Sequence, residues 1–397
     1  MKKINIMGIS VASLRKDEAI RAIREYLADG KKHFIATVNP EMILASDRDE
    51  EFFYILNEAD LALPDGIGLK FAAWVSGKNL VRITGADLVK DVLAIAEELK
   101  LKVTILNWEK SLSKNDDIAR ALRADYGKLE FEILTVGRDH KDIDAHADGD
   151  IIIANQGAPF QEKLIFHHLK NWPKAKLAIG VGGALDFLTR KITRAPGFMR
   201  LFGLEWLWRL IIEPKVRWKR IINAVIIFPY QFIQWKFVYP RKYRPNVVCL
   251  VYKIENGEKK ILLVERSDQA GHWQMPQGGT DGLPIKIAAL KEISEELGTD
   301  KAEIKKIYKN IYKYKFEDRV ILDKTYANLS QRHRGYKGQK QSLAIAEFRG
   351  KENDLKLKYW DHQSFKWVPA ERLVEEAYLV RREGYKIFLE KFSGAVK

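Results

Sequence analysis

Cysteine is the scarcest residue of this sequence, which has 397 residues and one cysteine, Cys249. A single cysteine excludes an intramolecular disulfide, so we expect a reducing, cytoplasmic setting. Internal repeats and low-complexity tracts are also lacking. An apolar run at 4–14 resembles the core of a signal peptide, but four charged residues follow it without a small-residue cleavage site. We interpret this run as a first buried strand.

Acidic side chains are in the minority, with 53 Asp and Glu against 68 Lys and Arg and a formal net charge of +15. Residues 1–186 carry 26 basic and 29 acidic side chains, residues 187–244 carry 13 and 2, and residues 245–397 carry 29 and 22. A positive net charge favours anionic partners such as phosphates, nucleic acid or an acidic membrane surface. The densest basic block is therefore 187–244.

The basic block 187–244 is also rich in Trp, Phe and Tyr. Its most apolar part, 221–238, is interrupted by polar residues and is shorter than the roughly 20 residues that span a bilayer. Basic and aromatic residues beside an apolar face are typical of a helix that lies in the interface of an anionic membrane. An amphipathic helix packed on its own domain or on another subunit would show the same pattern.

Short apolar runs alternate with helical patterns in the first 186 residues. Six runs are expected to be strands: HFIATV, LALP, KVTIL, FEILTV, DIIIANQG and KLAIGVGG. Residues 88–99 and 162–169 show helical spacing between them. Alternating strands and helices predict an α/β domain with a parallel sheet covered on both faces.

Two prolines and several charged and aromatic residues break this pattern at 239–245, where we expect a domain boundary. After it, NVVCLVYKI and KKILLVER predict a hairpin around Glu255-Asn256-Gly257. A glycine-rich loop, a helix, further strands and a helix from about residue 369 follow. We divide the chain into a core at 1–196, a basic aromatic appendage at 197–240 and a C-terminal domain at 241–397.

Polar residues gather in three loops that follow strands of the first domain, at 37–41, 64–68 and 82–87. Ligands of open α/β sheets bind outside the carboxyl ends of the strands. Asp65 lies between a proline and a glycine, where a tight turn would direct its carboxylate into the crevice. Such a carboxylate can serve as a general base. The alternative is that Asp65 only caps the following helix.

Six ordered motifs lie within residues 1 to about 235. They read TVNPEM, ADLALPDGIGLKFAAW, RITGADL, GAPFQEKLI, GVGGALDF and RAPGFMRLFGLEWLWRLIIEPKVRWKR. In these motifs the sequence resembles the WecG/TagA/CpsF glycosyltransferase family. The resemblance implies a Rossmann-like enzyme that transfers an N-acetylhexosamine-type sugar, such as ManNAc or ManNAcA, from a UDP-sugar to a polyprenyl-diphosphate-linked GlcNAc. It further implies inversion at the anomeric centre, no obligatory metal, and a place in cell-surface polysaccharide or teichoic acid synthesis.

The same resemblance assigns roles to single residues. It makes Asp65 the general base, places Thr37 and Asn39 in the active-site loop, sets Arg82 against donor or acceptor phosphates, and puts Gln161 in a GxPxQE motif. Hydroxyl and amide groups can bind sugar hydroxyls, and a guanidinium binds diphosphate through a planar fork. Taken singly, Thr37 and Asn39 could be turn residues. Arg82 could be a surface ion-pair partner, and Gln161 could be a helix-start residue.

The appendage contributes three arginines, Arg209, Arg217 and Arg220, and the resemblance implies that it closes over the active site at the membrane. Arg217 and Arg220 are three residues apart, so on a helix they share a face. This pair could clamp the acceptor diphosphate. Alternatively, both could be solvated charges that only attract lipid. Where the family usually has a Gly-Gly loop and, further on, a Gly-Tyr-Phe-type loop, this sequence has Leu106-Asn107-Trp108-Glu109-Lys110 and Gly137-Arg138-Asp139-His140. Glycines let a backbone approach phosphate closely, so the mode of nucleotide binding and the donor sugar stay open.

Three carboxylates lie within five positions in the C-terminal half: Glu292, Glu295 and Glu296. On a helix they share one face and offer hard oxygen ligands that suit Mg²⁺ or Mn²⁺. A solvated acidic helix face is the alternative. The Gly-Gly loop before this helix and Gly298 after it favour the metal site.

The segment 278–299 is similar to the Nudix box, and YRPNVV, HWQMPQGG and GYKGQKQ resemble the RNA pyrophosphohydrolase and dinucleoside-polyphosphate hydrolase branch. This resemblance covers about 243–395 and implies an α/β/α sandwich that hydrolyses a nucleoside-diphosphate-linked substrate with Mg²⁺. It places Gly278 and Gly279 in the Nudix loop and the three glutamates on the metal. Lys291 replaces the arginine of the box, and Leu283 stands where its first glutamate belongs. Because lysine lacks the planar fork of arginine, we expect weak or narrowed activity, or an inactive scaffold.

The sequence thus predicts a bifunctional enzyme, a glycosyltransferase fused to a Nudix hydrolase, cytoplasmic and peripheral at the inner face of the cell membrane. Its expected partners are a UDP-sugar, a polyprenyl-diphosphate-linked acceptor and an anionic membrane surface, and a homo-oligomer is compatible with it. One alternative is an RNA 5′-end pyrophosphohydrolase whose charge serves nucleic acid. An inactive Nudix nucleotide sensor on a glycosyltransferase scaffold is another. The concentration of charge in 187–244 and the lack of an RRM motif disfavour nucleic acid.

Overall fold

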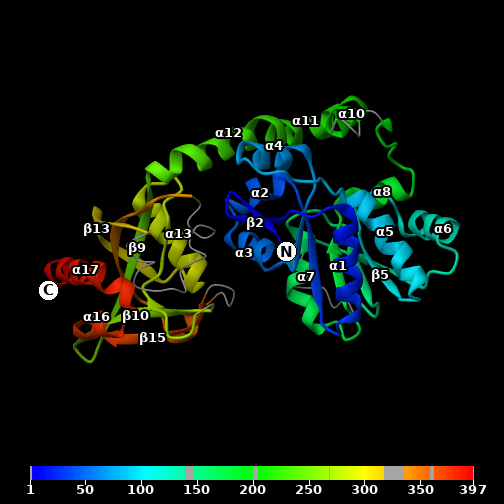
Figure 1. Ribbon diagram of the computed structural model, residues 1–397. Helices are drawn as coiled ribbons and strands as arrows, with labels where there is room; N and C mark the ends of the chain where they lie inside the picture. Colours follow the sequence, from blue (N-terminus) through cyan, green and yellow to red (C-terminus); the bar gives the residue numbers. More distant parts are fainter. Residues whose placement is uncertain are drawn as a thin grey trace. The chain divides into compact units, whose positions relative to one another are not determined.

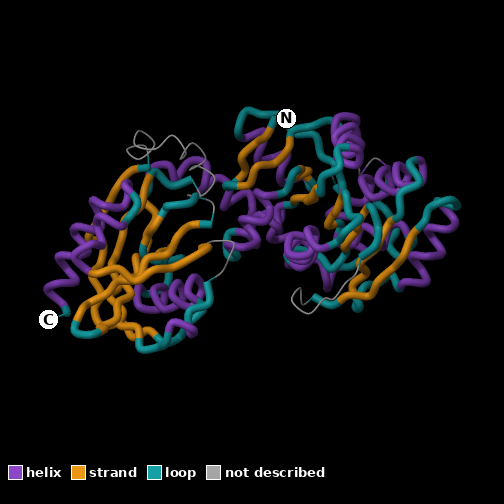
Figure 2. The backbone as a smooth tube through the Cα atoms, turned by 90° about the horizontal axis from the view of Figure 1, so that it is seen from below, coloured by secondary structure: helices purple, strands orange, loops and turns teal. Residues whose placement is uncertain are grey.

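The computed structural model describes residues 2–138, 147–197, 199, 204–267, 269–316, 335–357 and 362–396, without the side chains of Arg209 and Val216. The chain divides into two compact units, Met1–Ile233 and Gln234–Lys397. Figures 1 and 2 show that each unit combines strands with flanking helices. Most of the expected appendage, 197–240, belongs to the first unit, and its last seven residues belong to the second.

A six-stranded sheet forms the centre of the first unit, and every neighbouring pair of its strands is parallel. In spatial order its strands are β4 (Leu61–Pro64), β3 (His33–Val38), β8 (Leu177–Gly180), β7 (Ile151–Ala154), β5 (Val103–Trp108) and β6 (Phe131–Val136). All six predicted strands and the predicted parallel α/β class are therefore confirmed.

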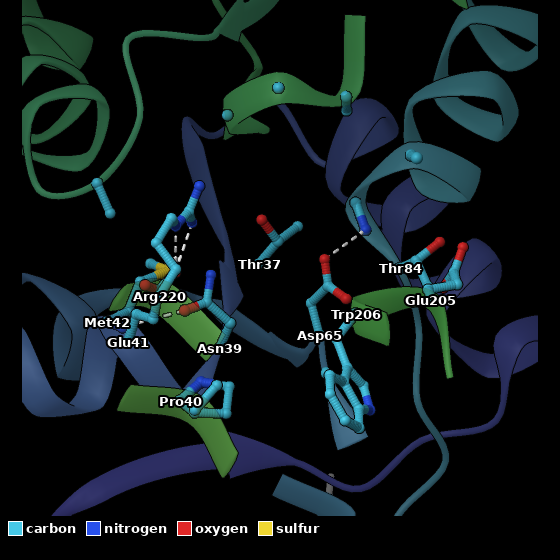
Figure 3. A pocket seen from close by; sticks show the side chains of 18 of the residues that line it. Thr37, Asn39, Pro40, Glu41, Met42, Asp65, Thr84, Glu205, Trp206 and Arg220 are labelled. Atoms are coloured by element: carbon cyan, nitrogen blue, oxygen red, sulfur yellow. Dashed lines mark hydrogen bonds and ion pairs between the residues drawn. The ribbon is translucent and has the colours of Figure 1, made fainter. Parts of the chain in front are cut away.

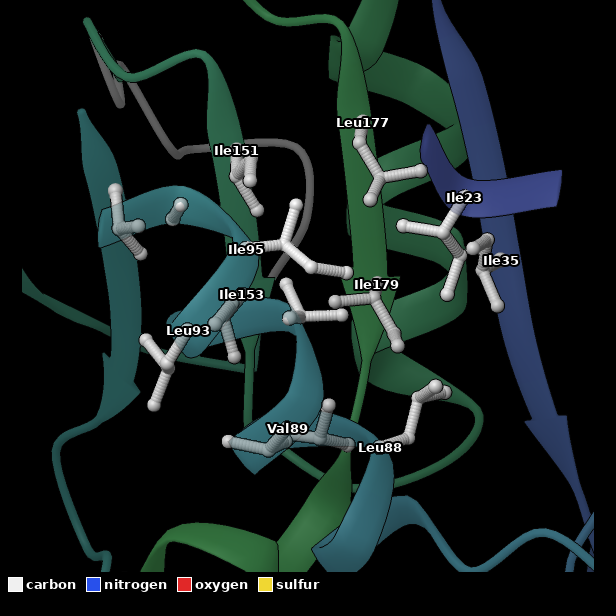
Figure 4. Close-up of a cluster of buried hydrophobic side chains, with 14 of the residues drawn as sticks. Ile23, Ile35, Leu88, Val89, Leu93, Ile95, Ile151, Ile153, Leu177 and Ile179 are labelled. Carbon is white, nitrogen blue, oxygen red and sulfur yellow. The ribbon is translucent and has the colours of Figure 1, made fainter. Parts of the chain in front are cut away.

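Helices α1 (Lys16–Ala28) and α5 (Gly85–Glu98) pack against this sheet. Their apolar residues recur at helical spacing, and the strands are apolar at consecutive positions because both faces of a parallel sheet are covered. Figure 4 shows the resulting core, in which sheet residues Ile35, Ile151, Ile153, Leu177 and Ile179 lie with Ile23 of α1 and Leu88, Val89, Leu93 and Ile95 of α5.

The N-terminal apolar run forms two strands instead of the single strand that we expected. β1 (Lys3–Ile6) and β2 (Ile9–Ala12) pair as an antiparallel hairpin outside the six-stranded sheet. The chain reverses at Met7 and Gly8, whose φ angles are 51° and 91°. Two successive residues with positive φ are typical of a two-residue hairpin turn, and the glycine adopts this conformation without steric penalty.

The remaining helices of the first unit connect the strands and continue into the appendage. They are α2 (Pro40–Ser46), α3 (Glu50–Glu58), α4 (Ile67–Val75), α6 (Asn115–Asp125), α7 (Phe160–His168), α8 (Leu185–Leu188), α10 (Glu205–Ile212), α11 (Pro214–Ile222) and α12 (Phe228–Ile233). Phe228 and Phe232 are fully buried where α12 contacts α2 and α4. On the side of α12 that carries these two rings, the appendage therefore packs on its own domain, which was the alternative to membrane binding.

Residues Arg217–Arg241 form one continuous helix of 25 residues, with π-helical turns at Asn223–Ile227 and Gln234–Val238. This helix is long and apolar enough to cross a membrane by length and composition alone. It is longer than the apolar stretch 221–238 on which the sequence-based length argument rested. Several of its apolar side chains are exposed, including Ile222, Ile226 and Tyr230.

A seven-stranded mixed sheet forms the centre of the second unit. Five strands follow the order β11 (Trp273–Gln274), β10 (Glu258–Arg266), β9 (Tyr243–Glu255), β14 (Gly338–Phe348) and β13 (Ala302–Lys315), while β12 (Gln277–Gly279) pairs with β9 and β15 (His362–Pro369) with β10. The hairpin predicted around 255–257 is confirmed, since Asn256 and Gly257 join β9 to β10 with φ angles of 53° and 81°.

Two hydrophobic cores lie on the two faces of this sheet. Alternate residues of β9 point to opposite faces, so Val248 and Leu250 join one core while Val247 and Cys249 join the other. Helix α17 (Arg382–Ala395) covers the first core and α13 (Ile285–Leu297) covers the second. The predicted α/β/α sandwich is therefore present, and its covering helix α13 carries the three glutamates.

Candidate active site

A cavity of about 560 Å³ opens in the first unit at the carboxyl ends of the parallel strands. The ends of five strands and the segments after them contribute to its lining: Thr37 within β3 and Asn39 just after it, Asp65 after β4, Arg138 after β6, Gly157 after β7 and Gly182 after β8. Helices α10 and α11 of the appendage line it as well. The volume is that of a small-molecule site, at the sheet edge where such sites form.

Asp65 lies in the turn between β4 and α4, where its backbone N–H donates to the Val38 carbonyl at 2.7 Å. Its Oδ2 accepts a hydrogen bond from the backbone N–H of Gly85 at 3.1 Å, at the first residue of α5 (Figure 3). The N-cap of α4 is Gly66, with no capping side chain, so Asp65 does not cap the helix that follows it. Its carboxylate is half-buried and lines the cavity.

Thr37 lies near the end of β3 and Asn39 directly follows that strand, and Figure 3 shows both side chains in the same part of the pocket as Asp65. The buried Thr37 hydroxyl donates to the Gly180 carbonyl at 2.9 Å. Asn39 is the N-cap of α2, because its Oδ1 accepts from the Met42 N–H at 3.0 Å and Pro40 begins the helix. This capping leaves the Asn39 amide NH₂ group as a donor toward a ligand.

Gln161 bridges two glycine loops at the edge of the cavity. Its Oε1 accepts from the N–H groups of Gly157 at 3.1 Å and Gly182 at 2.8 Å, and its Nε2 donates to Glu162 Oε1 at 2.6 Å. Glu162 is completely buried, and burial raises its pKa to about 7, although the hydrogen bond from Gln161 acts in the opposite direction. Gln161 thus holds the loops after β7 and β8 in place.

Every predicted arginine of the pocket whose side chain is described is ion-paired. Arg82 lies 2.9 Å from Glu205, Arg217 lies 3.0 Å from Glu213, and the Nε of Arg220 donates to Glu41 at 2.7 Å. Arg217 and Arg220 both line the cavity from α11, which supports a shared face. The predicted Arg209 side chain lies outside the described residues.

Sequence reasoning missed several residues of this pocket. Arg194 lines it and pairs with Asp87 and Glu205, and Arg138 lines it after β6. Arg194 and Glu205 lie within the quoted motifs, but their pairing joins separate segments and gives no signal at short spacing. Arg138 stands in a loop that the sequence marks as a departure from the family.

The predicted Nudix residues of the second unit come together only in part. Glu292 and Glu296 are buried on α13, whereas the Glu295 side chain is 46% exposed and lies 3.6 Å from Lys291, which also lies 3.7 Å from Asp281. The backbone N–H of Gln277 donates to Glu296 Oε1 at 3.4 Å. Lys291 therefore supports Glu295, one helical turn away, by an ion pair.

The predicted glycines of the Nudix segment have clear structural reasons. A Cβ at Gly278 would overlap the Glu292 carboxylate, and one at Gly279 would overlap the Arg244 guanidinium. Gly298 ends α13 in the left-handed conformation, with φ 63°. The two loop glycines thus let a carboxylate and a guanidinium approach the backbone of β12.

Among the residues that the structure describes, no group of three His, Cys, Asp or Glu side chains is arranged to hold a metal ion. The donor set nevertheless suits Mg²⁺ in part, because Glu292 and Glu296 are buried carboxylates on one face of α13. Mg²⁺ is commonly held by one or two carboxylates together with waters and substrate phosphates. Glu295 could join them only by leaving Lys291.

Comparisons with known proteins match both units. The family described as Glycosyl transferase WecG/TagA/CpsF matches residues 4–242, and the NUDIX domain matches residues 242–390. The chain is 33% identical over 196 residues to an N-acetylglucosaminyldiphosphoundecaprenol N-acetyl-beta-D-mannosaminyltransferase of Bacillus subtilis (strain 168), covering 48% of this chain and 75% of that protein. It is 36% identical over 161 residues to an RNA pyrophosphohydrolase of Wolbachia pipientis subsp. Culex pipiens (strain wPip), covering 40% of this chain and 93% of that protein.

A solved structure, that of a C. elegans Ap4A hydrolase binary complex, shares 20% identity at a TM-score of 0.28 and covers 38% of this chain and 98% of that one.

Proposed function

The chain belongs to the WecG/TagA/CpsF glycosyltransferase family and carries a fused NUDIX domain, and from this premise we propose that it is a bifunctional enzyme. The first unit transfers an N-acetylhexosamine-type sugar, ManNAc or ManNAcA-like, from a UDP-sugar to a polyprenyl-diphosphate-linked GlcNAc. The second unit hydrolyses a diphosphate attached to a nucleoside. The printed names of the relatives, a mannosaminyltransferase and an RNA pyrophosphohydrolase, support this pairing.

The observation that carries the transferase proposal is the placement of Asp65, Thr37 and Asn39 in one cavity lined by arginines. In the proposed reaction the Asp65 carboxylate accepts the proton of the acceptor hydroxyl. The hydroxyl oxygen then forms a bond to the anomeric carbon, while the bond from that carbon to the diphosphate oxygen breaks and UDP leaves with the electron pair. Attack from the face opposite UDP inverts the anomeric centre.

The arginines of the cavity are proposed to stabilise the two diphosphates. Guanidinium groups suit this role because they remain charged and bind phosphate through two parallel hydrogen bonds. Arg82 would face donor or acceptor phosphates, and Arg217 and Arg220 would clamp the acceptor. Because each already pairs with a carboxylate, phosphate binding replaces or shares an existing ion pair.

A peripheral membrane location is proposed for the appendage. Apolar side chains of its helices are exposed, including Ile211, Trp218, Ile226 and Tyr230, while basic residues such as Lys219 lie beside them. An apolar face with basic and aromatic neighbours binds the interface of an anionic bilayer. This location would bring the lipid-linked acceptor to the cavity, which the same helices line.

The second unit is proposed to act on 5′-triphosphate RNA or another nucleoside-diphosphate-linked substrate with Mg²⁺ or Mn²⁺ bound by Glu292 and Glu296. A bound divalent ion would polarise the phosphate and lower the pKa of a bound water. Arg244, whose guanidinium lies against Gly279 and 3.9 Å from Asp281, is proposed to bind a substrate phosphate. Hydrolysis of 5′-triphosphate RNA is favoured among these substrates by the relative's name.

The transferase proposal is tested by incubating the purified full-length protein with UDP-ManNAc and a short-chain prenyl-diphosphate-GlcNAc, scoring UDP and lipid-linked disaccharide. Parallel incubations use UDP-ManNAcA and UDP-GlcNAc. Formation of a disaccharide with one of these donors supports the proposal. UDP release without disaccharide would show hydrolysis instead, and no turnover of any donor would overturn the proposed transfer.

A further inference from the structure

Five arginines line the cavity of the first unit, and their charges are not equally compensated. Four are ion-paired with carboxylates, in the pairs Arg82–Glu205, Arg194–Asp87, Arg217–Glu213 and Arg220–Glu41. The fifth, Arg138, has no ion pair with any residue in the described parts of the chain. An anion that binds Arg138 therefore displaces no carboxylate of the described residues, which makes this guanidinium the strongest candidate in the cavity for a first anion contact.

The guanidinium of Arg138 lies over two aromatic rings, and these contacts do not use its N–H donors. Its Cζ lies 3.7 Å from the ring centroid of Trp108 and 4.8 Å from that of Phe160. Its Nε donates to the Gln156 carbonyl at 3.0 Å. A guanidinium has five N–H donors, and the four on the two terminal nitrogens have no acceptor among the residues that the structure describes. Partial burial lowers the pKa of Arg138, but arginine stays protonated at neutral pH.

Buried amides hold the backbone of Trp108 at the end of β5. The backbone N–H of Trp108 donates to Asn155 Oδ1 at 2.6 Å. The side-chain amide of Asn155 donates to Asn107 Oδ1 at 2.7 Å, and that of Asn107 donates to Asn115 Oδ1 at 2.7 Å. Asn107 and Asn155 are buried. These bonds fix the end of β5 against β7, so the platform under Arg138 exists before a ligand arrives, and binding needs little ordering.

The position of Arg138 connects it to the reaction site. A Cβ at Gly157 would lie 3.7 Å from Arg138 Nη2, and the N–H of Gly157 donates to Gln161. Arg138 and Asp65 line the same cavity, from the ends of β6 and β4. Trp108 ends β5, and Arg138 follows Gly137 in the loop after β6, so the two side chains come from the ends of two neighbouring strands.

We propose that Arg138, whose guanidinium lies over the rings of Trp108 and Phe160, binds a negatively charged group of the sugar-nucleotide donor. This inference rests on the proposed transferase function. The group recognised is an oxyanion, which could be a phosphate of the diphosphate or a carboxylate on the transferred sugar. Both chemistries fit the planar pair of N–H donors that a guanidinium presents.

Binding measurements on the purified full-length protein test this assignment without relying on turnover. UDP and uridine are titrated by calorimetry against the wild type, Arg138→Gln, Arg138→Lys and the control Arg120→Gln. Arg120 is 78% exposed on α6 and pairs with Asp117, so its replacement removes one positive charge away from the cavity. If the diphosphate is recognised, Arg138→Gln weakens UDP binding about tenfold to a hundredfold, as expected for a lost charged hydrogen bond.

The remaining arms identify the source of the anion. Recognition of the diphosphate predicts unchanged uridine binding and equal losses for UDP-ManNAc and UDP-ManNAcA, with only partial recovery in Arg138→Lys because lysine lacks the fork and the stack. Recognition of a sugar carboxylate predicts unchanged UDP binding and a loss confined to UDP-ManNAcA. Phe160→Leu, which removes one of the two aromatic rings near the Arg138 guanidinium, should produce a weaker loss of the same kind.

Two results would overturn the assignment in different ways. If Arg138→Gln binds UDP and both UDP-sugars within twofold of the wild type, Arg138 does not recognise the donor, while the proposed transfer stands. If the wild type binds none of these ligands and transfers no sugar, the proposed function fails and the inference fails with it. The Arg120→Gln control should stay within twofold of the wild type throughout.

Discussion

Replacing Glu162 with Gln should make the stability of the first unit less dependent on pH. Glu162 is completely buried, and burial raises its pKa from an ordinary value of 4.5 to about 7. Between these values the unfolded chain has released the proton that the folded protein still holds, so unfolding becomes easier as pH rises. The loss is absent well below pH 4.5, grows through the interval and is complete above pH 7.

The size of this effect follows from the pKa difference. A pKa raised from 4.5 to about 7 lowers the free energy of unfolding by about 3 kcal/mol at pH 8, relative to low pH. About 1 kcal/mol of this decrease has already occurred at pH 5. Glutamine has the same shape, keeps an oxygen to accept the hydrogen bond from Gln161, and does not titrate. The stability difference between Glu162→Gln and wild type should therefore move by about 2 kcal/mol in favour of the variant between pH 5 and pH 8.

Differential scanning calorimetry of the full-length protein at both pH values measures this change. A change of 2 kcal/mol corresponds to roughly 4–8 °C in the melting temperature of a unit of this size. The control is Glu25→Gln, an exposed position of α1, for which the difference from wild type should be the same at pH 5 and pH 8. If the difference in melting temperature between Glu162→Gln and wild type is the same at pH 5 and pH 8, the folded protein does not keep a proton on Glu162 over this interval, and the reasoning is refuted.

Three further outcomes follow from the packing and charges described above. Ile226→Glu, at a side chain 60% exposed on the appendage helix, should reduce sedimentation with anionic liposomes, whereas Leu112→Glu, 53% exposed elsewhere in the first unit, should not; equal binding of both would contradict the membrane face. Phe228→Ala should lower the stability of the first unit by about 3–5 kcal/mol in chemical unfolding, since it removes a fully buried ring between α12 and α4, and a loss below 1 kcal/mol would argue against that docking. Glu296→Gln should suppress any Mg²⁺-dependent release of diphosphate from 5′-triphosphate RNA, because an amide is a poorer ligand for this ion than a carboxylate. Lys291→Arg should preserve or raise the rate of this release. If the wild type is active and Lys291→Arg lowers the rate, the loop is adapted to lysine.

The strands were predictable because each is a short, wholly apolar run between polar segments. Runs such as 151–154 and 177–180 are buried at every position, as central strands of a parallel sheet require. The N-terminal run 4–14 misled us because its turn consists of Met7 and Gly8, and a single glycine inside an apolar run is a weak signal. Both family resemblances are confirmed by the matches over 4–242 and 242–390.

The candidate site was predictable where motif and local geometry coincide. Thr37 lies near the end of β3, Asn39 and Asp65 directly follow β3 and β4, and Gln161 lies in the first turn of α7, the helix after β7. They meet because parallel strands end at one edge of the sheet. The charge balance of the arginines was beyond sequence reasoning, since Glu41 meets Arg220 from 179 positions away. The availability of Arg138 becomes visible only when those ion pairs are known.

The most direct test of the proposed transfer is the rate of disaccharide formation by Asp65→Asn, measured with the donor that the wild type uses and prenyl-diphosphate-GlcNAc. The asparagine oxygen can still accept from Gly85, so the fold and UDP binding should be retained, but the amide cannot accept the acceptor proton. Asp60→Asn is the matched control, because Asp60 accepts from the Phe34 N–H at the opposite end of the same sheet. We predict that Asp65→Asn lowers the rate by about 10²–10⁴ with an unchanged dissociation constant for UDP, while Asp60→Asn stays close to wild type. Transfer by Asp65→Asn within a few-fold of wild type would contradict the assignment of Asp65 as the general base.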